Sequence, residues 1–385
     1  MLYEKAWAKL FGTYQILEST SLEQMLRDST GAPVETYACK DMETVWNILT
    51  EASTQGYIIL ASINNEQAKI SPEEIYSRGL NPLYANTVLD ISLSSSSENR
   101  IIKLRNIWND QHTWRSQAIN EEADEEKKII NMTLKEFFLI FTHIHVCQYN
   151  ERLIYKSITN RHVHQAYSIT KFTCNTPMKT TLELIQNDHR LYRGDPTYAY
   201  SNSRFLIFRV TNSRPYYIKG SFSTSKYNTL RINLEEGDYY IVGIVDWKDK
   251  VYDFTLSAYS DAEINFERIH YSDNPDIISE LLKAYMEDQS IPRPLSKSGN
   301  KEIVKYEKAV EDLKIKIELY MNNSTTKQVN VRKKLARMEN TNLLNVAPEE
   351  ENDEVEFKLW PQTSKVVITG TNDVSRPSNY ASEDM

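Results

Sequence analysis

The apolar pattern of the chain changes its period partway along the sequence. In the first part, apolar residues recur at helical spacing, as at Val45, Leu49 and Ala52. In the second part, short alternating segments rich in β-branched and aromatic residues follow one another, separated by turn residues. A chain of 385 residues also exceeds what a single core usually holds. The sequence therefore predicts an α+β domain over residues 1–149 and an antiparallel β-sandwich over residues 150–265.

The first domain is predicted to combine helices with a sheet. A helix is expected over Met42–Gln55, and Gly56 suits the position after it because glycine adopts positive φ easily. A second helix is expected over Met132–Val146, with Phe137 and Phe141 on its apolar face. Strands are expected over residues 57–63, 83–93 and 101–108. The last two strands would form a hairpin.

The segment after the sandwich is predicted to be helical. Apolar residues recur there in steps of three and four, at Ile303, Tyr306, Val310, Leu313, Ile317 and Tyr320. This spacing predicts a helical extension over residues 275–340, and residues 341–385 are expected to be an extended polar tail. Because so short a seam is marginal alone, the helix Ile303–Tyr320 and the tail are predicted to bind other proteins. Microtubule-associated proteins are one candidate.

Composition narrows the range of functions. The net charge of −8 argues against nucleic acid as the partner of the whole chain. The three cysteines, Cys39, Cys147 and Cys174, are too few and too scattered for a disulfide framework, and they fit a reducing compartment. There is no run of about 18 apolar residues, so no transmembrane segment is expected. The cytoplasm is the expected setting.

Six segments, in order along the chain, resemble motifs of the calpain family of papain-like cysteine proteases. They are EKAWAKLFGTY at residues 4–14, LRDSTG at 26–31, LRNIWN at 104–109, KEFFLIFTHIHVC at 135–147, LEEGDYYIV at 234–242 and DFTLSAY at 253–259. The resemblance implies that residues 1–149 are the second lobe of the calpain protease core. It implies that residues 150–265 are the C2-like β-sandwich of calpains.

The same resemblance implies a defective catalytic site. A papain-type site needs a Cys nucleophile, a His base and an Asn that orients the His. The Cys-bearing first lobe is expected to be absent, since the chain begins inside a helix of the second lobe. In the His motif, matched by GLNPLYANTV at residues 79–88, Tyr84 stands in the His position, and a phenol with a pKa of about 10 is no base at neutral pH. Asn106 matches the orienting Asn, and Cys39 matches no nucleophile motif.

Other candidate sites are weaker. His164 begins a second His-like motif, but it follows Asn106, which reverses the order in the family. His143 and His145 would share one face of a strand, as would His162 and His164, and neither pair has an evident third metal ligand. The acidic run 121–126 and the acidic residues of the sandwich leave calcium binding open, although solvated surface charge is the simpler interpretation. No cofactor or metal is therefore expected.

These observations favour a chain that is not an enzyme. The leading hypothesis is a calpain-like scaffold, a pseudoprotease whose domains bind proteins in a cytoskeletal or ciliary assembly such as the axoneme. The first alternative is one half of a split calcium-dependent cysteine endopeptidase whose nucleophile lobe lies on another chain. The second alternative is a C2-type binder of calcium or membranes.

Overall fold

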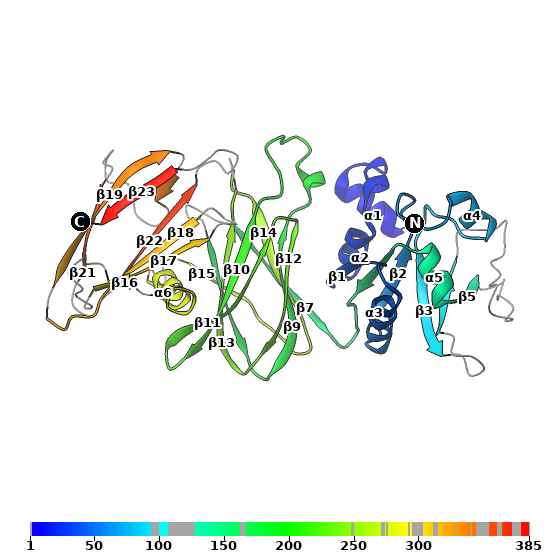
Figure 1. Cartoon of the computed structure of the whole chain (residues 1–385), viewed down its shortest axis with the longest axis horizontal. Coiled ribbons are helices and arrows are strands. Elements are labelled where there is room, and N and C mark those ends of the chain that lie inside the picture. Colours follow the sequence, from blue (N-terminus) through cyan, green and yellow to red (C-terminus); the bar gives the residue numbers. More distant parts are fainter. Residues whose placement is uncertain are drawn as a thin grey trace. The chain divides into compact units, whose positions relative to one another are not determined.

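The computed structural model describes residues 2–93, 100–106, 128–161, 167–247, 250–270, 274, 276–291, 293–294, 303–310, 315–326, 328–339, 341–343, 354–359, 364–371 and 379–384. The chain divides into two compact units, Met1–Tyr155 and Lys156–Met385. Figure 1 labels the elements of both units. The described residues are mostly antiparallel sheets with a few helices, which is an α+β architecture.

The first unit contains a six-stranded antiparallel sheet in the order β1-β6-β2-β3-β4-β5. Its strands are β1 (Val34–Ala38), β2 (Ile58–Ser62), β3 (Asn86–Leu93), β4 (Arg100–Arg105), β5 (Ile129–Thr133) and β6 (His143–Cys147). The hairpin of β3 and β4 was expected from the sequence and is present. The order brings β6, the last strand of the unit, between β1 and β2.

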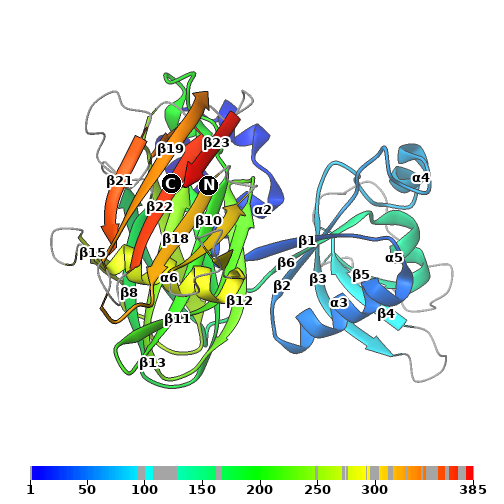
Figure 2. The same ribbon diagram turned by 60° about the vertical axis from the view of Figure 1, so that its left-hand side comes forward.

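Helices pack on this sheet and form parts of the connections between its strands. They are α1 (Leu2–Phe11), α2 (Leu22–Thr30), α3 (Met42–Thr54), α4 (Pro72–Ser77) and α5 (Leu134–Ile140), with a 3₁₀ helix η1 (Gln15–Ser19). Asp41 caps α3 by accepting a hydrogen bond from the Thr44 amide at 2.8 Å. The apolar stripe of α3 and the buried face of α5 pack on the sheet in one core (Figure 2).

The helix predicted over Met132–Val146 is correct only over Leu134–Ile140 and is wrong at both ends, since Met132 and Thr133 belong to β5. The Thr133 and Glu136 capping box begins α5, which ends at Ile140 because Phe141 is already extended. Residues 143–147 then form β6, where four of five side chains are buried. A strand that lies between two others and is covered needs a nearly continuous apolar run, and such a run is easily mistaken for part of a buried helix.

The second unit begins with a β-sandwich. One sheet has the order β11-β10-β13-β8-β15 and the other β12-β9-β14-β7. The strands are β7 (Ile154–Arg161), β8 (Ser168–Cys174), β9 (Met178–Gln186), β10 (Ser203–Thr211), β11 (Arg214–Ser223), β12 (Tyr227–Leu234), β13 (Gly237–Val245), β14 (Asp253–Ser260) and β15 (Glu267–Ile269), with a 3₁₀ helix η2 (His189–Tyr192) between β9 and β10. Side chains of both sheets form one core, in which Phe172 and Tyr239 stack with ring centroids 5.1 Å apart.

Helix α6 (Ile277–Gln289) joins the sandwich to a further sheet. Seven of its residues are buried, and they share a core with Leu206 and Phe208 of the sandwich and with Leu319. The further sheet has the order β16-β17-β18-β22-β20, and beside it lies a three-stranded sheet, β21-β19-β23. The strands are β16 (Arg293–Pro294), β17 (Ile303–Val310), β18 (Ile315–Asn322), β19 (Val329–Glu339), β20 (Thr341–Leu343), β21 (Glu354–Leu359), β22 (Ser364–Thr371) and β23 (Asn379–Asp384).

The described residues of the predicted helix Ile303–Tyr320 and of the predicted extended tail 341–385 form strands, so both predictions are wrong there. The segment is a hairpin of β17 and β18, in which Tyr306 pairs with Leu319 and Val304 with Met321. Its β-branched and aromatic residues favour strands, and the steps of three and four arose where two alternating segments met. The supposed tail supplies β20 to β23, because β18 and β19 need partner strands for their backbone groups.

Candidate functional site

The segment that matches the calpain His motif is a loop fixed at both ends. Ser71 caps α4 by accepting a hydrogen bond from the Glu74 amide at 3.2 Å, and Pro72 occupies the first helical turn. The helix ends at Ser77, and Gly79 follows with a φ of +89°, which suits a residue without Cβ. Ile75 and Leu80 are fully buried beneath this turn. The loop then runs to Asn86, the first residue of β3, three residues later than the strand start expected from the sequence.

Asn106 holds this loop against the hairpin. It follows β4 directly, and its backbone amide donates a hydrogen bond to the Lys128 carbonyl at 2.9 Å. Its side-chain Nδ2 donates to the carbonyl oxygen of Gly79 at 2.7 Å, and the residue is buried. The side-chain amide of Asn106 therefore binds the backbone of the loop through its NH2 group.

Asn86 lies next to this contact and is a second buried asparagine. Thr87 pairs with Arg105 in the β3–β4 ladder, so Asn86 and Asn106 occupy the next positions on the two strands. Asn86 is 1% exposed, and within the described part of the chain neither of its side-chain polar atoms has a hydrogen-bond partner. Asn106 Oδ1 is likewise buried without one. Such groups are uncommon because each costs free energy.

Tyr84, at the His position of the motif, lies at the surface. Its side chain is 43% exposed, and that of Leu83 is 72% exposed. The Tyr84 amide donates to the Asn81 carbonyl at 3.2 Å, which closes a turn just before β3. The register that puts a phenol in the His position, and its consequence for catalysis, stay predictions from the sequence.

All three cysteines are buried thiols. Burial raises the pKa of Cys39 to about 11, with a smaller opposing effect from the Lys69 charge. Burial also raises the pKa of Cys147 on β6 and of Cys174 on β8. A nucleophilic cysteine needs a lowered pKa and access to solvent. The environments of these thiols are the opposite of what catalysis requires.

His145 is a buried imidazole on β6. Its Nδ1 lies 2.9 Å from Thr36 Oγ1 on β1, and its Nε2 lies 2.8 Å from Ser62 Oγ on β2. Burial, with the nearby charge of His143 as a smaller cause, lowers the pKa of His145 to about 4. Two hydroxyl groups therefore hold a neutral imidazole, and it joins three strands instead of facing solvent.

Several sequence candidates lie outside the described residues. They are His162, His164, the segment 107–127 with its tryptophans, and the acidic run 121–126. Among the residues that are described, no group of three His, Cys, Asp or Glu side chains is arranged to hold a metal ion. Nor does the described part contain a helix that is long and apolar enough to cross a membrane.

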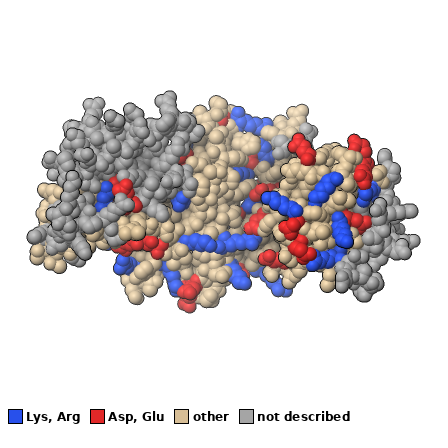
Figure 3. Space-filling model, in the orientation of Figure 1, with Lys and Arg blue, Asp and Glu red and all other residues tan. Residues whose placement is uncertain are grey.

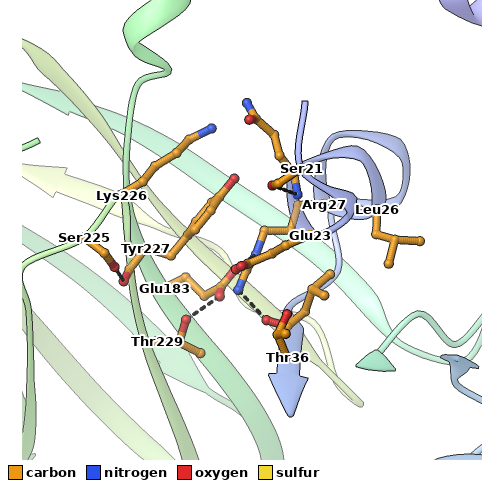
Figure 4. Close-up of polar contacts among 12 residues, drawn as sticks. Ser21, Glu23, Leu26, Arg27, Thr36, Glu183, Ser225, Lys226, Tyr227 and Thr229 are labelled. Atoms are coloured by element: carbon orange, nitrogen blue, oxygen red, sulfur yellow. Dashed lines mark hydrogen bonds and ion pairs between the residues drawn. The ribbon is translucent and has the colours of Figure 1, made fainter. Parts of the chain in front are cut away.

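The second unit carries a buried charge cluster that sequence reasoning missed. Asp188 is 5% exposed and contacts Arg190 Nε at 2.9 Å and Lys226 Nζ at 3.0 Å. Burial alone would raise the pKa of Asp188, but these two cations hold it well below its usual range. Nearby on β9, the buried Glu183 accepts a hydrogen bond from Thr229 Oγ1 at 2.6 Å (Figure 4). Single charged residues in a strand-rich sequence gave no signal for this pairing.

Comparison with known proteins agrees with the resemblance seen in the motifs. The model of the calpain family cysteine protease domain matches residues 1–148. These residues are a calpain-family domain. Mouse calpain-9 and human calpain-9 are each 28% identical to the chain, over 164 and 165 residues, and each match covers 38% of this chain. The matches cover 24% of either relative, so the chain spans about a quarter of the length of these proteins.

Solved structures add nothing to this calpain-family assignment. Vicilin from Capsicum annuum matches with 10% identity and a TM-score of 0.18, covering 60% of this chain and 74% of that one. The oxalate decarboxylase formate complex of Lactobacillus farciminis matches with 8% identity and a TM-score of 0.16, covering 60% and 76%. Scores this low support no conclusion about the fold.

Proposed function

We propose that this chain is a non-catalytic calpain-like interaction protein. The observation that carries the proposal is the position of Tyr84, a surface phenol in a motif where the family has a histidine. A thiol protease needs a base that takes a proton at neutral pH, and a phenol does not supply one.

The thiols support the same proposal. A nucleophile of this class sits in an electropositive, partly exposed place that lowers its pKa. Cys39, Cys147 and Cys174 are buried, and burial raises the pKa of each. We therefore assign them to packing.

The proposed architecture is a papain-like second lobe followed by a C2-like sandwich. The first unit has the mixed helices and antiparallel sheet that such a lobe requires, and the second unit begins with two facing antiparallel sheets. In a chain without catalytic activity, the lobe and the sandwich would both serve as binding surfaces. By analogy with inactive relatives of calpains, a cytoskeletal or ciliary assembly is the proposed setting.

The native state of the protein tests the interaction role. A detergent extract of cells that make the protein is separated by size, and the same column is run with the purified recombinant chain. We expect the native protein to elute in a larger species, or to remain with the insoluble cytoskeleton. Elution of all native protein at the position of the recombinant monomer would contradict the role.

A further inference from the structure

Three large apolar side chains are exposed together beside the candidate site. Leu83 is 72% exposed, Tyr84 is 43% exposed and Tyr76, on α4, is 41% exposed. We call these three residues the apolar loop patch. Exposed aromatic side chains that lie near one another often contribute much of the binding free energy in protein interfaces.

The apolar loop patch is held in one arrangement. Asn81 Oδ1 accepts a hydrogen bond from the Tyr76 hydroxyl at 3.1 Å and another from the Leu83 amide at 3.0 Å. One oxygen atom therefore ties the helix side of the patch to its loop side. Pro82 is buried between the exposed positions. A surface that is ordered before binding loses less conformational entropy when a partner arrives.

The stretch of chain that carries the patch has more acidic than basic residues. Residues 64–90 contain four acidic and two basic residues. Arg78 pairs with Glu74 at 2.5 Å, and Lys69 Nζ donates to the Phe138 carbonyl at 2.8 Å over the Phe138 ring. Both cations are thus engaged locally.

Glu73 is the acidic residue placed to act with the patch. It lies three residues before Tyr76 on α4, so the two share one face of the helix. Backbone hydrogen bonding, with help from Ser71, lowers the pKa of Glu73. Figure 3 shows acidic and basic side chains interspersed over the first unit, and Figure 2 shows α4 at the outer edge of its unit.

We propose that the apolar loop patch binds a segment of a partner protein in which apolar side chains alternate with lysine or arginine. The apolar residues of the segment would cover Leu83 and the tyrosine rings, and its cations would face Glu73. The carboxylate of Glu73 disfavours an anionic membrane as the partner. This inference rests on the proposed interaction role and specifies its partner.

The test uses the full chain and two short fluorescein-labelled peptides. One peptide alternates leucine with lysine, and the other has glutamate in place of each lysine. We expect the lysine peptide to bind about tenfold more tightly than the glutamate peptide, measured by fluorescence anisotropy. Equal binding of both peptides, or no binding of the lysine peptide, would overturn the proposal.

Variants locate the binding on the patch. Leu83→Ser combined with Tyr84→Ser should weaken binding of the lysine peptide about tenfold. Glu73→Gln should weaken it about threefold and reduce its dependence on salt. Leu93→Ser is the matched control, since Leu93 is 70% exposed at the end of β3. An equal loss of peptide affinity with Leu93→Ser would show non-specific hydrophobic binding and would refute the proposal that the patch is the binding site.

Two further measurements keep the outcome clear. Leu83→Lys places a cation in the patch, so it should also weaken binding even if the double serine variant does not fold. Mass spectrometry of the recovered peptide separates the two proposals. Cleavage of the peptide would refute the non-catalytic role. The difference in affinity between the variants would still show whether the peptide binds at the apolar loop patch.

Discussion

Asn106 donates a side-chain hydrogen bond of 2.7 Å to the carbonyl oxygen of Gly79, while Asn86, at the corresponding position of the paired strand, makes none with its side chain among the described residues. The first residue fastens the loop that carries Tyr84 to the β3–β4 hairpin. The second is a buried amide without a hydrogen-bond partner among the described residues. The two asparagines thus have opposite expected effects on stability.

Replacing each asparagine by leucine tests this difference. Asn106→Leu leaves the buried Gly79 carbonyl without its donor, so the free energy of unfolding should fall by about 1–3 kcal/mol. Asn86→Leu removes a buried polar group that gains no hydrogen bond, so the free energy of unfolding should stay the same or rise by about 1 kcal/mol. Urea unfolding of both variants gives the comparison. Equal losses would show that Asn86 is hydrogen-bonded in solution.

The cysteines should resist alkylation in the folded protein. With a pKa of about 11, Cys39 is almost entirely a neutral thiol at neutral pH, and Cys147 and Cys174 are also buried with raised pKa values. Mass spectrometry after iodoacetamide treatment should find little modification in native buffer and full modification in urea. Rapid labelling of Cys39 in native buffer would contradict its buried position.

His145 should make the first unit less stable in acid. Its pKa falls from 6.5 to about 4 on folding, so the unfolded state binds more protons between these values. Stability is therefore complete above about pH 6.5 and decreases as the pH falls toward about 4, by up to about 3 kcal/mol.

A variant isolates the contribution of this histidine. His145→Gln should lose less stability than the wild type when urea unfolding is repeated at lower pH. His189→Gln is the control, since the His189 side chain is 64% exposed. The same pH dependence in all three proteins would assign the acid sensitivity to other groups.

Disrupting the charge cluster of the second unit should strongly destabilise the folded protein. Asp188→Asn removes the carboxylate from the buried Arg190 and from Lys226, so the free energy of unfolding should fall by about 3–5 kcal/mol. Asp195→Asn is the comparison, because Asp195 also contacts a lysine, Lys250, but that lysine is 60% exposed. Calorimetry should show a much smaller change for Asp195→Asn. Similar losses of unfolding free energy in the two variants would mean that the burial of Asp188 does not increase its contribution to stability.

The sequence was most informative where local signals agreed. The stripe of α3 and Gly56 after it placed that helix to within a residue, and the polar tip between residues 93 and 100 marked the β3–β4 hairpin. The order of the motifs along the chain also pointed to the calpain family, which the family match over residues 1–148 confirms. These signals are local, so they do not depend on how distant segments pack.

The wrong secondary-structure predictions came from apolar spacing that is compatible with both a helix and a pair of strands. Residues 303–320 carried a helical step pattern, yet pairing of Lys305 with Tyr320 and of β18 with β22 decides their structure. The pairing of β18 with β22 joins residues far apart in the sequence, so no window of sequence shows it. For the same reason the exposure of Leu83 and Tyr84 could not be predicted, because it depends on where β3 begins and on what Leu80 is buried against.

A peptidase assay on the purified chain tests the central claim most directly. The chain, with calcium and a reducing agent, is incubated with a fluorogenic peptide library, with and without iodoacetamide, and the Tyr84→His variant is assayed in parallel. The account predicts no cleavage by either protein, because restoring an imidazole provides no reactive thiol. Cleavage by the wild-type chain that iodoacetamide abolishes would contradict it.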